Sequence, residues 1–306
     1  TARRFLRLIS GEAFTCGVLH DDGLYCWGRG TEGQHGGGTT VNSASPLPAA
    51  GARRFLSVAA GTAHVCGVDV ARALWCWGRN TDGQVGTTGE GPETTAVRLL
   101  AGEGFGVVAA GARHGCALGY PQALAWCWGA NESGQLGRAT GGARGLPERV
   151  SGSLRLADLA ATETSTCGVT AEGELYCWGA MGGAQPTRIA SPAPLVSLSD
   201  GGLGRHLCAL AADGRAFCWG AGADGQLGDG AALDRGVPTA VTTTARFRAL
   251  ATGPRNSCGV TLDNRLLCWG SGSLGAGAGV HRSDVPVPVA EPREGTEACP
   301  EGGCLP

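Results

Sequence analysis

Residues 64–77 read His-Val-Cys-Gly-Val-Asp-Val-Ala-Arg-Ala-Leu-Trp-Cys-Trp, and a glycine follows. The stretch contains two short apolar runs, and each run carries one cysteine. The same pattern, a cysteine pair with Trp-Gly after its second member, occurs six times: Cys16 and Cys26, Cys66 and Cys76, Cys116 and Cys127, Cys167 and Cys177, Cys208 and Cys218, and Cys258 and Cys268. The first cysteines of successive pairs are 50, 50, 51, 41 and 50 residues apart, which indicates six copies of one unit.

Each unit is predicted to form four short strands. The first is apolar, as at 55–60, and the second and third form a hairpin, as at 15–19 and 24–27 around Asp21-Asp22-Gly23. A fourth strand begins at a proline, as at 147–150 or 238–241, and no segment shows sustained helical periodicity. We therefore predict an all-β fold, a single β-propeller of six four-stranded repeats. The predicted propeller covers residues 1–290, with repeats at about 1–50, 51–100, 101–150, 151–192, 193–242 and 243–290, and a tail at 291–306.

The hairpin register predicts how the cysteines pair. If Cys16 faces Cys26, then Gly17 faces Tyr25, and in every copy a small residue would oppose a large one. The small residues are Gly17, Gly67, Ala117, Gly168, Ala209 and Gly259, and the large ones are Tyr25, Trp75, Trp126, Tyr176, Phe217 and Leu267. We predict six disulfides, each within one repeat. Metal binding is disfavoured because the paired cysteines are too far apart in sequence. Cys299 and Cys304, outside the repeats, either bond to one another or include an intermolecular partner.

Composition excludes several kinds of function. The 24 basic residues are all arginine, so lysine-dependent phosphate loops and Schiff-base chemistry are absent. A net charge of -2 gives no reason to expect nucleic-acid binding, and no apolar run approaches the roughly 18 residues of a membrane span. His64, His114 and His206 share one position of the repeat, but we interpret them as structural rather than metal ligands. No nucleophile–base pattern appears, so we predict a non-enzyme without a metal or cofactor.

Glycine-rich loops follow the repeated tryptophans, Trp27, Trp77, Trp128, Trp178, Trp219 and Trp269. Residues 28–33 match the dinucleotide pattern GxGxxG, but no helix follows to receive a pyrophosphate, so nucleotide binding is not expected. The middle position of this pattern alternates between Gly and Asn, which predicts a left-handed backbone there. The recurring Gln34, Gln84, Gln135, Gln185 and Gln226 are predicted to brace the loops by hydrogen bonds.

The segments between these loops and the fourth strands vary most, at 37–45, 87–95, 138–146, 229–237 and 278–285. Repeat four lacks this segment, since Gln185 is followed directly by Pro186. Because the segments share one position in the repeat, we expect five polar loops at one end of the propeller around a notch at repeat four. We name Asn42, Glu93, Arg144, Asp234 and His281 as candidate partner-binding residues, with neutral insertion as the alternative. Asn131-Glu-Ser133 is also a glycosylation sequon.

The loop motifs carry a family resemblance. Trp-Gly-Arg-Asn-Thr-Asp-Gly-Gln-Val-Gly at 77–86 and Trp-Gly-Ala-Asn-Glu-Ser-Gly-Gln-Leu-Gly at 128–137 resemble the regulator of chromosome condensation repeat family, and the resemblance covers residues 1 to about 290. It implies a propeller, usually of seven blades, so seven blades with an atypical closing blade is the alternative to six.

The resemblance also frames the functional expectation. The family's nuclear founding member is a nucleotide-exchange factor that docks on chromatin through a basic tail, which this chain lacks. Its regularly paired cysteines instead predict an oxidising compartment: extracellular, cell-surface or periplasmic. A secreted bacterial member of the family binds enzymes through loops at one end of its propeller, and plant receptor kinases carry a related ectodomain. We predict a secreted or cell-surface scaffold that binds a protein partner through its loops. The alternative is a carbohydrate-binding propeller with a surface glycan as partner, and a nucleotide-exchange factor or an enzyme is less favoured.

Overall fold

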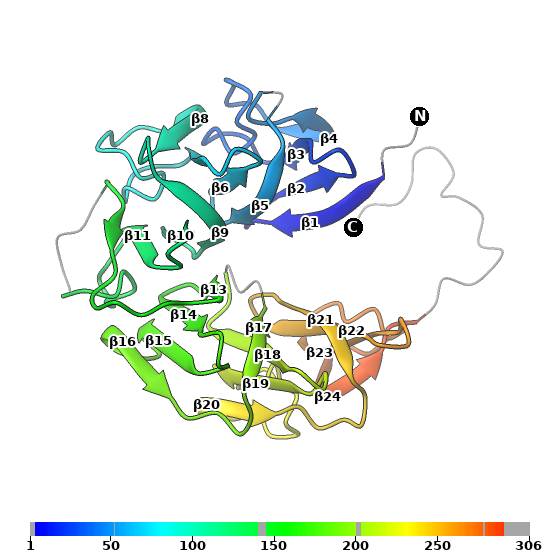
Figure 1. Cartoon of the computed structure of the whole chain (residues 1–306). Helices are drawn as coiled ribbons and strands as arrows, with labels where there is room; N and C mark the ends of the chain where they lie inside the picture. The colour runs from blue at the N-terminus through cyan, green and yellow to red at the C-terminus, as the bar shows by residue number, and fades with distance from the viewer. Residues whose placement is uncertain (1–3, 52, 140–144, 200–202, 278, 291–306) are drawn as a thin grey trace, which may run out of the picture.

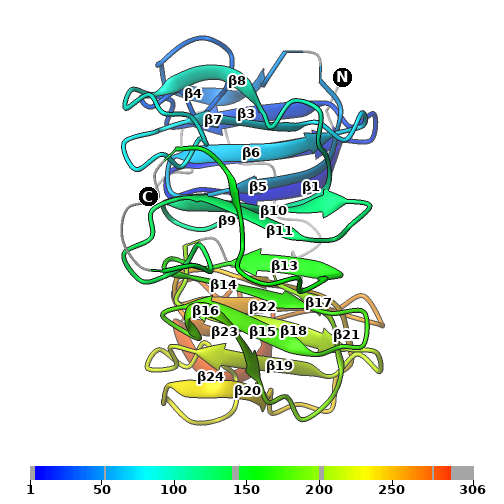
Figure 2. The ribbon, with the colours of Figure 1, turned by 60° about the vertical axis from the view of Figure 1, so that its left-hand side comes forward.

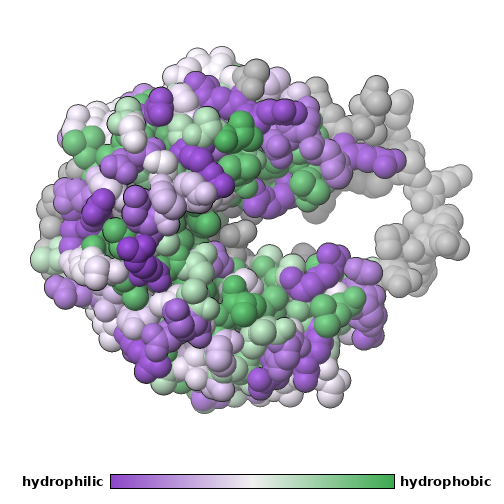
Figure 3. Space-filling model, in the orientation of Figure 1, coloured by the Kyte–Doolittle hydropathy of each residue, from purple (hydrophilic) through white to green (hydrophobic). Residues whose placement is uncertain are grey.

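The computed structural model describes residues 4–51, 53–139, 145–199, 203–277 and 279–290, and these form strands but no helix. The strands make six four-stranded antiparallel sheets, each with its strands in chain order. Figures 1 and 2 show these sheets following one another as the blades of a propeller, and the space-filling view in Figure 3 shows a channel at the centre. The prediction of six four-stranded blades is confirmed, rather than the seven-blade alternative.

The blades have the following strands. Blade one contains β1 (Phe5–Ser10), β2 (Phe14–Leu19), β3 (Leu24–Gly28) and β4 (Ser43–Pro48). Blade two contains β5 (Phe55–Ala60), β6 (His64–Asp69), β7 (Leu74–Gly78) and β8 (Glu93–Leu99). Blade three contains β9 (Gly104–Ala110), β10 (His114–Tyr120), β11 (Ala125–Gly129) and β12 (Glu148–Arg149). Blade four contains β13 (Asp158–Ala161), β14 (Ser165–Val169), β15 (Leu175–Gly179) and β16 (Gly183–Ile189). Blade five contains β17 (Leu195–Leu198), β18 (His206–Ala211), β19 (Ala216–Gly220) and β20 (Arg235–Ala240). Blade six contains β21 (Phe247–Thr252), β22 (Asn256–Thr261), β23 (Leu266–Ser271) and β24 (Arg282–Pro288).

The central hairpin of every blade has the predicted register. Cys16 lies opposite Cys26 and Gly17 opposite Tyr25, and the other five hairpins repeat this pairing. Six disulfides join the paired cysteines within their own blades, with Cα atoms 4.1 Å apart in each. Cys299 and Cys304 lie outside the described residues.

The reason for the small residue after the first cysteine differs from the expected one. A Cβ on Gly67 would lie 2.5 Å from the ring of Phe55, on the first strand, rather than against Trp75 across the hairpin. Gly17 has the same relation to Phe5, at 2.4 Å, and Gly259 to Phe247, at 2.5 Å. The glycine therefore makes room for the first-strand aromatic, which lies over the hairpin.

Neighbouring blades meet through two different faces. The face of blade one that carries Cys16 and Cys26 packs against Phe55, Val58 and Trp77 of blade two. The same pairing of a disulfide face with a Trp face recurs between each following pair of blades, as far as blade six. We call each such contact a joint. Burying one indole removes on the order of 200 Å² from water, which is worth roughly 4–6 kcal/mol before the entropic cost of ordering.

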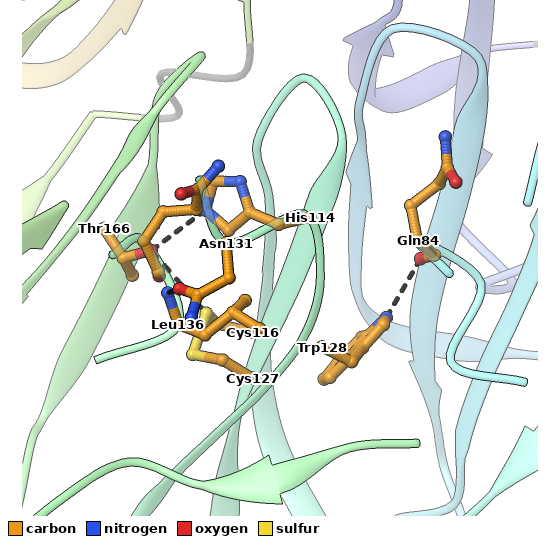
Figure 4. Close-up of a disulfide and its surroundings, with 9 residues drawn as sticks. Gln84, His114, Cys116, Cys127, Trp128, Asn131, Leu136 and Thr166 are labelled. Carbon is orange, nitrogen blue, oxygen red and sulfur yellow. Dashed lines mark hydrogen bonds between the residues drawn. A yellow bond between two sulfur atoms is a disulfide. The ribbon is translucent and has the colours of Figure 1, made fainter. Parts of the chain in front are cut away.

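In two joints the tryptophan also donates a hydrogen bond to the glycine-rich loop of the preceding blade, whereas Nε1 of Trp178, Trp219 and Trp269 has no hydrogen-bond partner. The indole Nε1 of Trp77 donates to the carbonyl oxygen of Gln34 at 2.9 Å, and Trp128 donates to Gln84 at 2.9 Å. Figure 4 shows the second of these bonds. Two residues after each glutamine, Gly36 and Gly86 have positive φ, and a Cβ on Gly36 would lie 2.8 Å from Nε1 of Trp77. In these joints the Gly-Gln-x-Gly motif therefore accepts the hydrogen bond of the next blade's tryptophan and leaves space for its indole ring.

We expect Gly67→Ala to lower the free energy of unfolding by about 1–3 kcal/mol, because the new methyl group would displace the ring of Phe55. In a double-mutant cycle by urea unfolding, Gly67→Ala should couple to Phe55→Leu by at least about 0.5 kcal/mol and should be additive with Trp75→Ala. Coupling to Trp75 instead would restore the cross-strand explanation.

Candidate functional site

The long loops gather at one end of the propeller, which we call the loop end. The loops between third and fourth strands span 29–42, 79–92, 130–147, 221–234 and 272–281, whereas blade four has only 180–182. The turns between first and second strands lie at this same end, because they join the same ends of neighbouring strands. Five loops therefore surround a low point at blade four, which we call the notch.

The residue that needs a left-handed backbone is not the one predicted. Gly78, which ends β7, has a φ of 105°, and a Cβ there would lie 2.5 Å from the carbonyl oxygen of Ala63. Two residues later, Asn80 does not have positive φ. The prediction of a left-handed conformation at the alternating Gly and Asn position is therefore wrong for Asn80, and for Asn131 as well.

Asn80 is instead selected for its side chain, which braces the loop. Its Oδ1 accepts the backbone N–H of Val85 at 2.9 Å, and its Nδ2 donates to Thr87 Oγ1 at 2.8 Å. Asn131 has the same role, with Leu136 N–H as donor at 3.0 Å and Ala139 carbonyl oxygen as acceptor at 2.9 Å. The sequon asparagine is 4% exposed and has both side-chain groups bonded.

In blades one and five the position of Asn80 is occupied by glycine, and a side chain later in the same loop accepts a hydrogen bond from the backbone N–H of that glycine. Gly30 N–H donates to Asn42 Oδ1 at 3.0 Å, and Gly222 N–H donates to Asp234 Oδ1 at 2.8 Å. A Cβ on Gly30 would lie 2.0 Å from the carbonyl oxygen of Val41, so the returning loop leaves room only for glycine. Two of the candidate partner-binding residues thus hold their loops in shape, and their contact with a partner stays a prediction.

The recurring glutamines brace the loops as predicted in four blades. The Oε1 atoms of Gln34, Gln84, Gln135 and Gln226 each accept a backbone N–H from two residues earlier, at 2.8–2.9 Å. Gln185 is the exception because it lies within β16, and its assignment as a loop residue is wrong.

His114 takes part in a buried chain of hydrogen bonds between blades three and four (Figure 4). Its Nε2 lies 2.9 Å from Thr166 Oγ1, and this hydroxyl donates to the carbonyl oxygen of Gln135 at 2.9 Å. Since the hydroxyl has a single proton, it must accept the Nε2 proton of His114. Burial, with the nearby His64 and Arg113, lowers the pKa of His114 to about 3, so the imidazole is neutral.

Blades five and six repeat this chain with serine. His206 Nε2 lies 2.7 Å from Ser257 Oγ, which donates to the carbonyl oxygen of Gln226 at 2.9 Å. Burial lowers the pKa of His206 to about 4. A Cβ on Gly111 would lie 2.5 Å from Nδ1 of His114, so no space remains on that side for a metal ion. The hydrogen bonds of His114 and His206 agree with the interpretation of these two residues as structural, whereas His64 is fully buried with no hydrogen bond to either ring nitrogen.

Ion pairs connect the turns and loops along the inner rim of the loop end. Arg113 Nη1 lies 2.9 Å from Asp82 Oδ1, and Arg255 Nε lies 3.9 Å from Asp224 Oδ2. Both pairs join a turn of one blade to the loop of the preceding blade. Because the two arginine side chains are 47% and 73% exposed, the pairs add little stability and mainly define an alternating surface charge.

The notch is an open pocket of about 340 Å³. Met181 and Arg205 line it from blades four and five, and Arg235 lines it from the start of β20. Arg205 Nε lies 3.7 Å from Glu163 Oε2, whereas Arg235 Nη2 is held 2.7 Å from the buried carboxylate of Asp229. A second pocket, of about 230 Å³, shares Thr164 with the notch. A third pocket, of about 160 Å³, lies at the opening of the central channel and is lined in part by Ala160 and Ala161.

The structure does not bring the candidate partner-binding residues together in one pocket. Asp234 lines the notch. Glu93 begins β8 and lies 3.3 Å from Thr87 Oγ1, and His281 is exposed before β24. Arg144 lies outside the described residues. The prediction from sequence missed Met181, Arg205 and Arg235, although the missing loop of repeat four did indicate their location.

Two absences apply to the described part of the chain. It contains no group of three or more His, Cys, Asp or Glu side chains placed to hold a metal ion. It also contains no helix long and apolar enough to cross a membrane.

Comparisons with known proteins identify the repeat. The regulator of chromosome condensation (RCC1) repeat matches residues 21–68 and 213–260, and a second model of this repeat matches 55–84 and 247–276. Human WBSCR16 is similar in structure, with 20% identity and a TM-score of 0.83 over 95% of this chain and 83% of that chain. Yeast RCC1 (Prp20), solved in a complex with Kap60, gives 18% identity and a TM-score of 0.80 over 94% of this chain and 75% of that chain.

A plant ectodomain is also similar. That of the Arabidopsis thaliana receptor kinase ACR4 has 22% identity and a TM-score of 0.57, over 94% of this chain and 83% of that chain. No curated protein matched the sequence. Identities this low show a shared fold alone.

We expect Asn131 to remain without a glycan when the chain is secreted from a eukaryotic host, because its Nδ2 is buried and donates a hydrogen bond in the folded protein. Intact-mass measurement before and after glycosidase treatment checks this. A mass loss that Asn131→Gln abolishes would contradict it.

Acid should destabilise the protein between about pH 6.5 and pH 4. The folded-state pKa values of His64 and His206, about 4, lie below the ordinary value of 6.5, so the unfolded chain binds protons first as the pH falls. Each such histidine makes stability fall by up to about 1.4 kcal/mol per pH unit in this window. His206→Asn, which copies Asn256 of blade six, should flatten the pH dependence of the urea midpoint, and an unchanged slope would contradict the assignment.

Proposed function

Since the chain is a six-bladed propeller of regulator of chromosome condensation repeats that is held by six disulfides, we propose that it is an extracellular protein-binding scaffold. A segment of the partner protein would enter the notch at blade four and contact the surrounding loops. The observation that carries this proposal is the open pocket of about 340 Å³ at the one blade without a long loop.

The notch has the properties of a recognition site on a rigid support. Its walls are fixed by the braced loop of blade five, in which Gly222 is bonded to Asp234. Met181 offers an adaptable apolar contact, and the partly exposed guanidinium groups of Arg205 and Arg235 can bind carboxylates or backbone carbonyls. The mixture favours a peptide segment with an apolar side chain and an acidic neighbour.

The carbohydrate alternative receives less support. Sugars are usually held by stacking on exposed aromatic rings, but the repeated tryptophans that precede a glycine in blades two to six are 0–1% exposed. Trp75 and Trp126 are partly exposed, but an arginine guanidinium lies over each ring. In the described loops and turns of the loop end, no Phe, Tyr or Trp occurs. For nucleotide exchange, the likeness to yeast RCC1 at 18% identity concerns the fold alone.

Filling the notch should abolish partner capture. Replacing residues 180–182 with the blade-five loop, 221–234, should reduce capture of a partner from an extracellular protein fraction at least about tenfold, as quantified by mass spectrometry after a non-reducing pull-down. A matched control inserts the same residues between Asp213 and Gly214, in a hairpin turn at the opposite end. Met181→Glu is a second, smaller change in the same pocket, and melting temperatures verify that all variants fold.

Equal capture by the filled-notch variant and the control would refute the proposal. Capture that simple sugars inhibit, or binding on a glycan array that the graft removes, would favour the carbohydrate-binding alternative.

A further inference from the structure

Three arginines of blades two and three lie over aromatic rings at the end of the propeller opposite the loop end. We call this the turn end, because it carries the hairpin turns between second and third strands. The stacked pairs are Arg53 over Trp75 at 3.7 Å, Arg72 over Tyr120 at 4.3 Å, and Arg149 over Trp126 at 5.0 Å, each measured from the guanidinium carbon to the ring centroid. At these distances the ring face attracts the cation. We call the three stacked pairs together the arginine strip.

The three stacks are connected through the fold. Trp75 Nε1 donates to Asp69 Oδ2 at 2.7 Å, and the backbone N–H of Arg72 donates to the carbonyl oxygen of Asp69 at 2.9 Å. The hairpin of blade two therefore joins the first stack to the second. Gly119, which precedes the tyrosine of the second stack, leads to the third, because a Cβ on Gly119 would lie 3.4 Å from Nε1 of Trp126.

The arginine strip lies at the surface. Tyr120 is 53% exposed, and Arg149 is exposed as well. Arg53, Arg72 and the two stacked tryptophans are partly exposed. The guanidinium groups therefore cover the rings from the solvent side rather than filling the core.

The arginines of the strip have no acidic partner of their own. In the described part of the chain, no ion pair joins Arg53, Arg72 or Arg149 to a carboxylate. Three arginines at the same end of blades four to six differ in this respect. Their ion pairs, at 2.6–2.9 Å, are Arg188 with Glu174, Arg215 with Asp213, and Arg265 with Asp263.

Two carboxylates lie among the stacks, but neither is paired with an arginine of the strip. Asp69 accepts three N–H groups, two from the backbone of its own turn at 2.9 Å and one from Trp75 at 2.7 Å. Glu103 is exposed and lies close to Arg72, since a Cβ on the adjoining Gly104 would be 3.6 Å from the Cβ of Arg72. The strip is thus positive, with acidic groups between its arginines.

We propose that the arginine strip binds an acidic segment of a partner protein, whose carboxylates contact the stacked guanidinium groups. A ring covers one face of each guanidinium and leaves its N–H edge free, and such an edge holds a carboxylate through two hydrogen bonds. Because the rings already restrict the arginine side chains, less conformational freedom is lost when a partner binds. Trp, Tyr and Arg are also the residues that contribute most to protein–protein binding.

The carboxylates between the stacks favour a protein segment over a densely charged polyanion. Asp69 and Glu103 would repel a sulfated glycan that carries charge along its whole length. A peptide segment with spaced acidic residues can contact the arginines and leave neutral residues beside the two carboxylates. The arginine strip and the notch are at opposite ends of the propeller, so this inference does not depend on the proposed function.

The experiment uses the full chain and a fluorescently labelled peptide in which glutamate alternates with glycine. Anisotropy is measured at about 0.1 M salt, where charges more than about 10 Å apart are largely screened. We expect the peptide to bind, and we expect the combined change of Arg53→Gln, Arg72→Gln and Arg149→Gln to weaken binding at least about tenfold. The matched control removes the same charge at the same end of the propeller, and it should change the affinity less than about twofold. It combines Arg188→Gln, Arg215→Gln and Arg265→Gln.

Two conservative variants test whether the stacking matters beyond the charge. Tyr120→Leu keeps every charge but removes the ring under Arg72, and Arg72→Lys keeps the charge but removes the planar guanidinium. Each should weaken binding at least about threefold. Tyr176→Leu, the matched control in blade four, should leave the affinity unchanged, and melting temperatures verify that all variants fold.

Four results would overturn the proposal. The first is no binding of the peptide to the unaltered chain. The second is equal weakening by the two triple variants, or unchanged affinity in both Tyr120→Leu and Arg72→Lys, because net charge alone would then account for the binding. The third is a sulfated oligosaccharide that binds more tightly than the peptide and is lost in the strip variant, which would assign the strip to a glycan. The fourth is a concentration-dependent dimer in light scattering that the strip variant abolishes, which would assign it to a second copy.

Discussion

The packing of one blade's Trp and Phe on the preceding blade's disulfide is the interaction on which the rest of the structure depends. A four-stranded sheet of this size buries too little on its own, so each blade needs a neighbour on both faces. The disulfide keeps the hairpin paired and small at its centre, which lets the next indole approach closely. The loop glycines then allow the carbonyl oxygens of Gln34 and Gln84 to accept a hydrogen bond from that indole. The shape of the loops at the loop end is therefore partly a consequence of how the blades are joined.

Much of the fold follows from the sequence because strand pairing has a period of two residues. Once Cys16 and Cys26 are placed opposite one another, the neighbouring pairs in the hairpin are determined, and all six hairpins have the predicted register. The reason for Gly67 was not accessible in the same way, because Phe55 reaches it from a strand whose register contains a bulge. The periodicity of one hairpin does not indicate which side chains from other strands pack against its face.

The candidate site was only partly predictable. The missing segment after Gln185 located the notch, but the residues that line it come from blades four and five and belong to no common motif. The hydrogen-bond chains had a signal that could have been used: Thr166 and Ser257 precede a first cysteine in the blades that follow His114 and His206. Asn42 and Asp234 lie in variable segments, yet their side chains maintain the loops that carry them. Sequence variation alone did not distinguish residues that maintain the shape of a loop from residues that could contact a partner.

Every disulfide of the described chain lies within one blade, so no covalent bond except the backbone crosses a joint. Under tension, the blades of such a propeller can separate from one another one at a time, because no disulfide links one blade to the next. Pulling the two ends apart would open the joints. The residues between the two cysteines of each oxidised hairpin would not extend, because the disulfide closes them into a loop. Under reducing conditions the same pull would also release those loops, so the redox state of the surroundings sets how far the molecule can stretch.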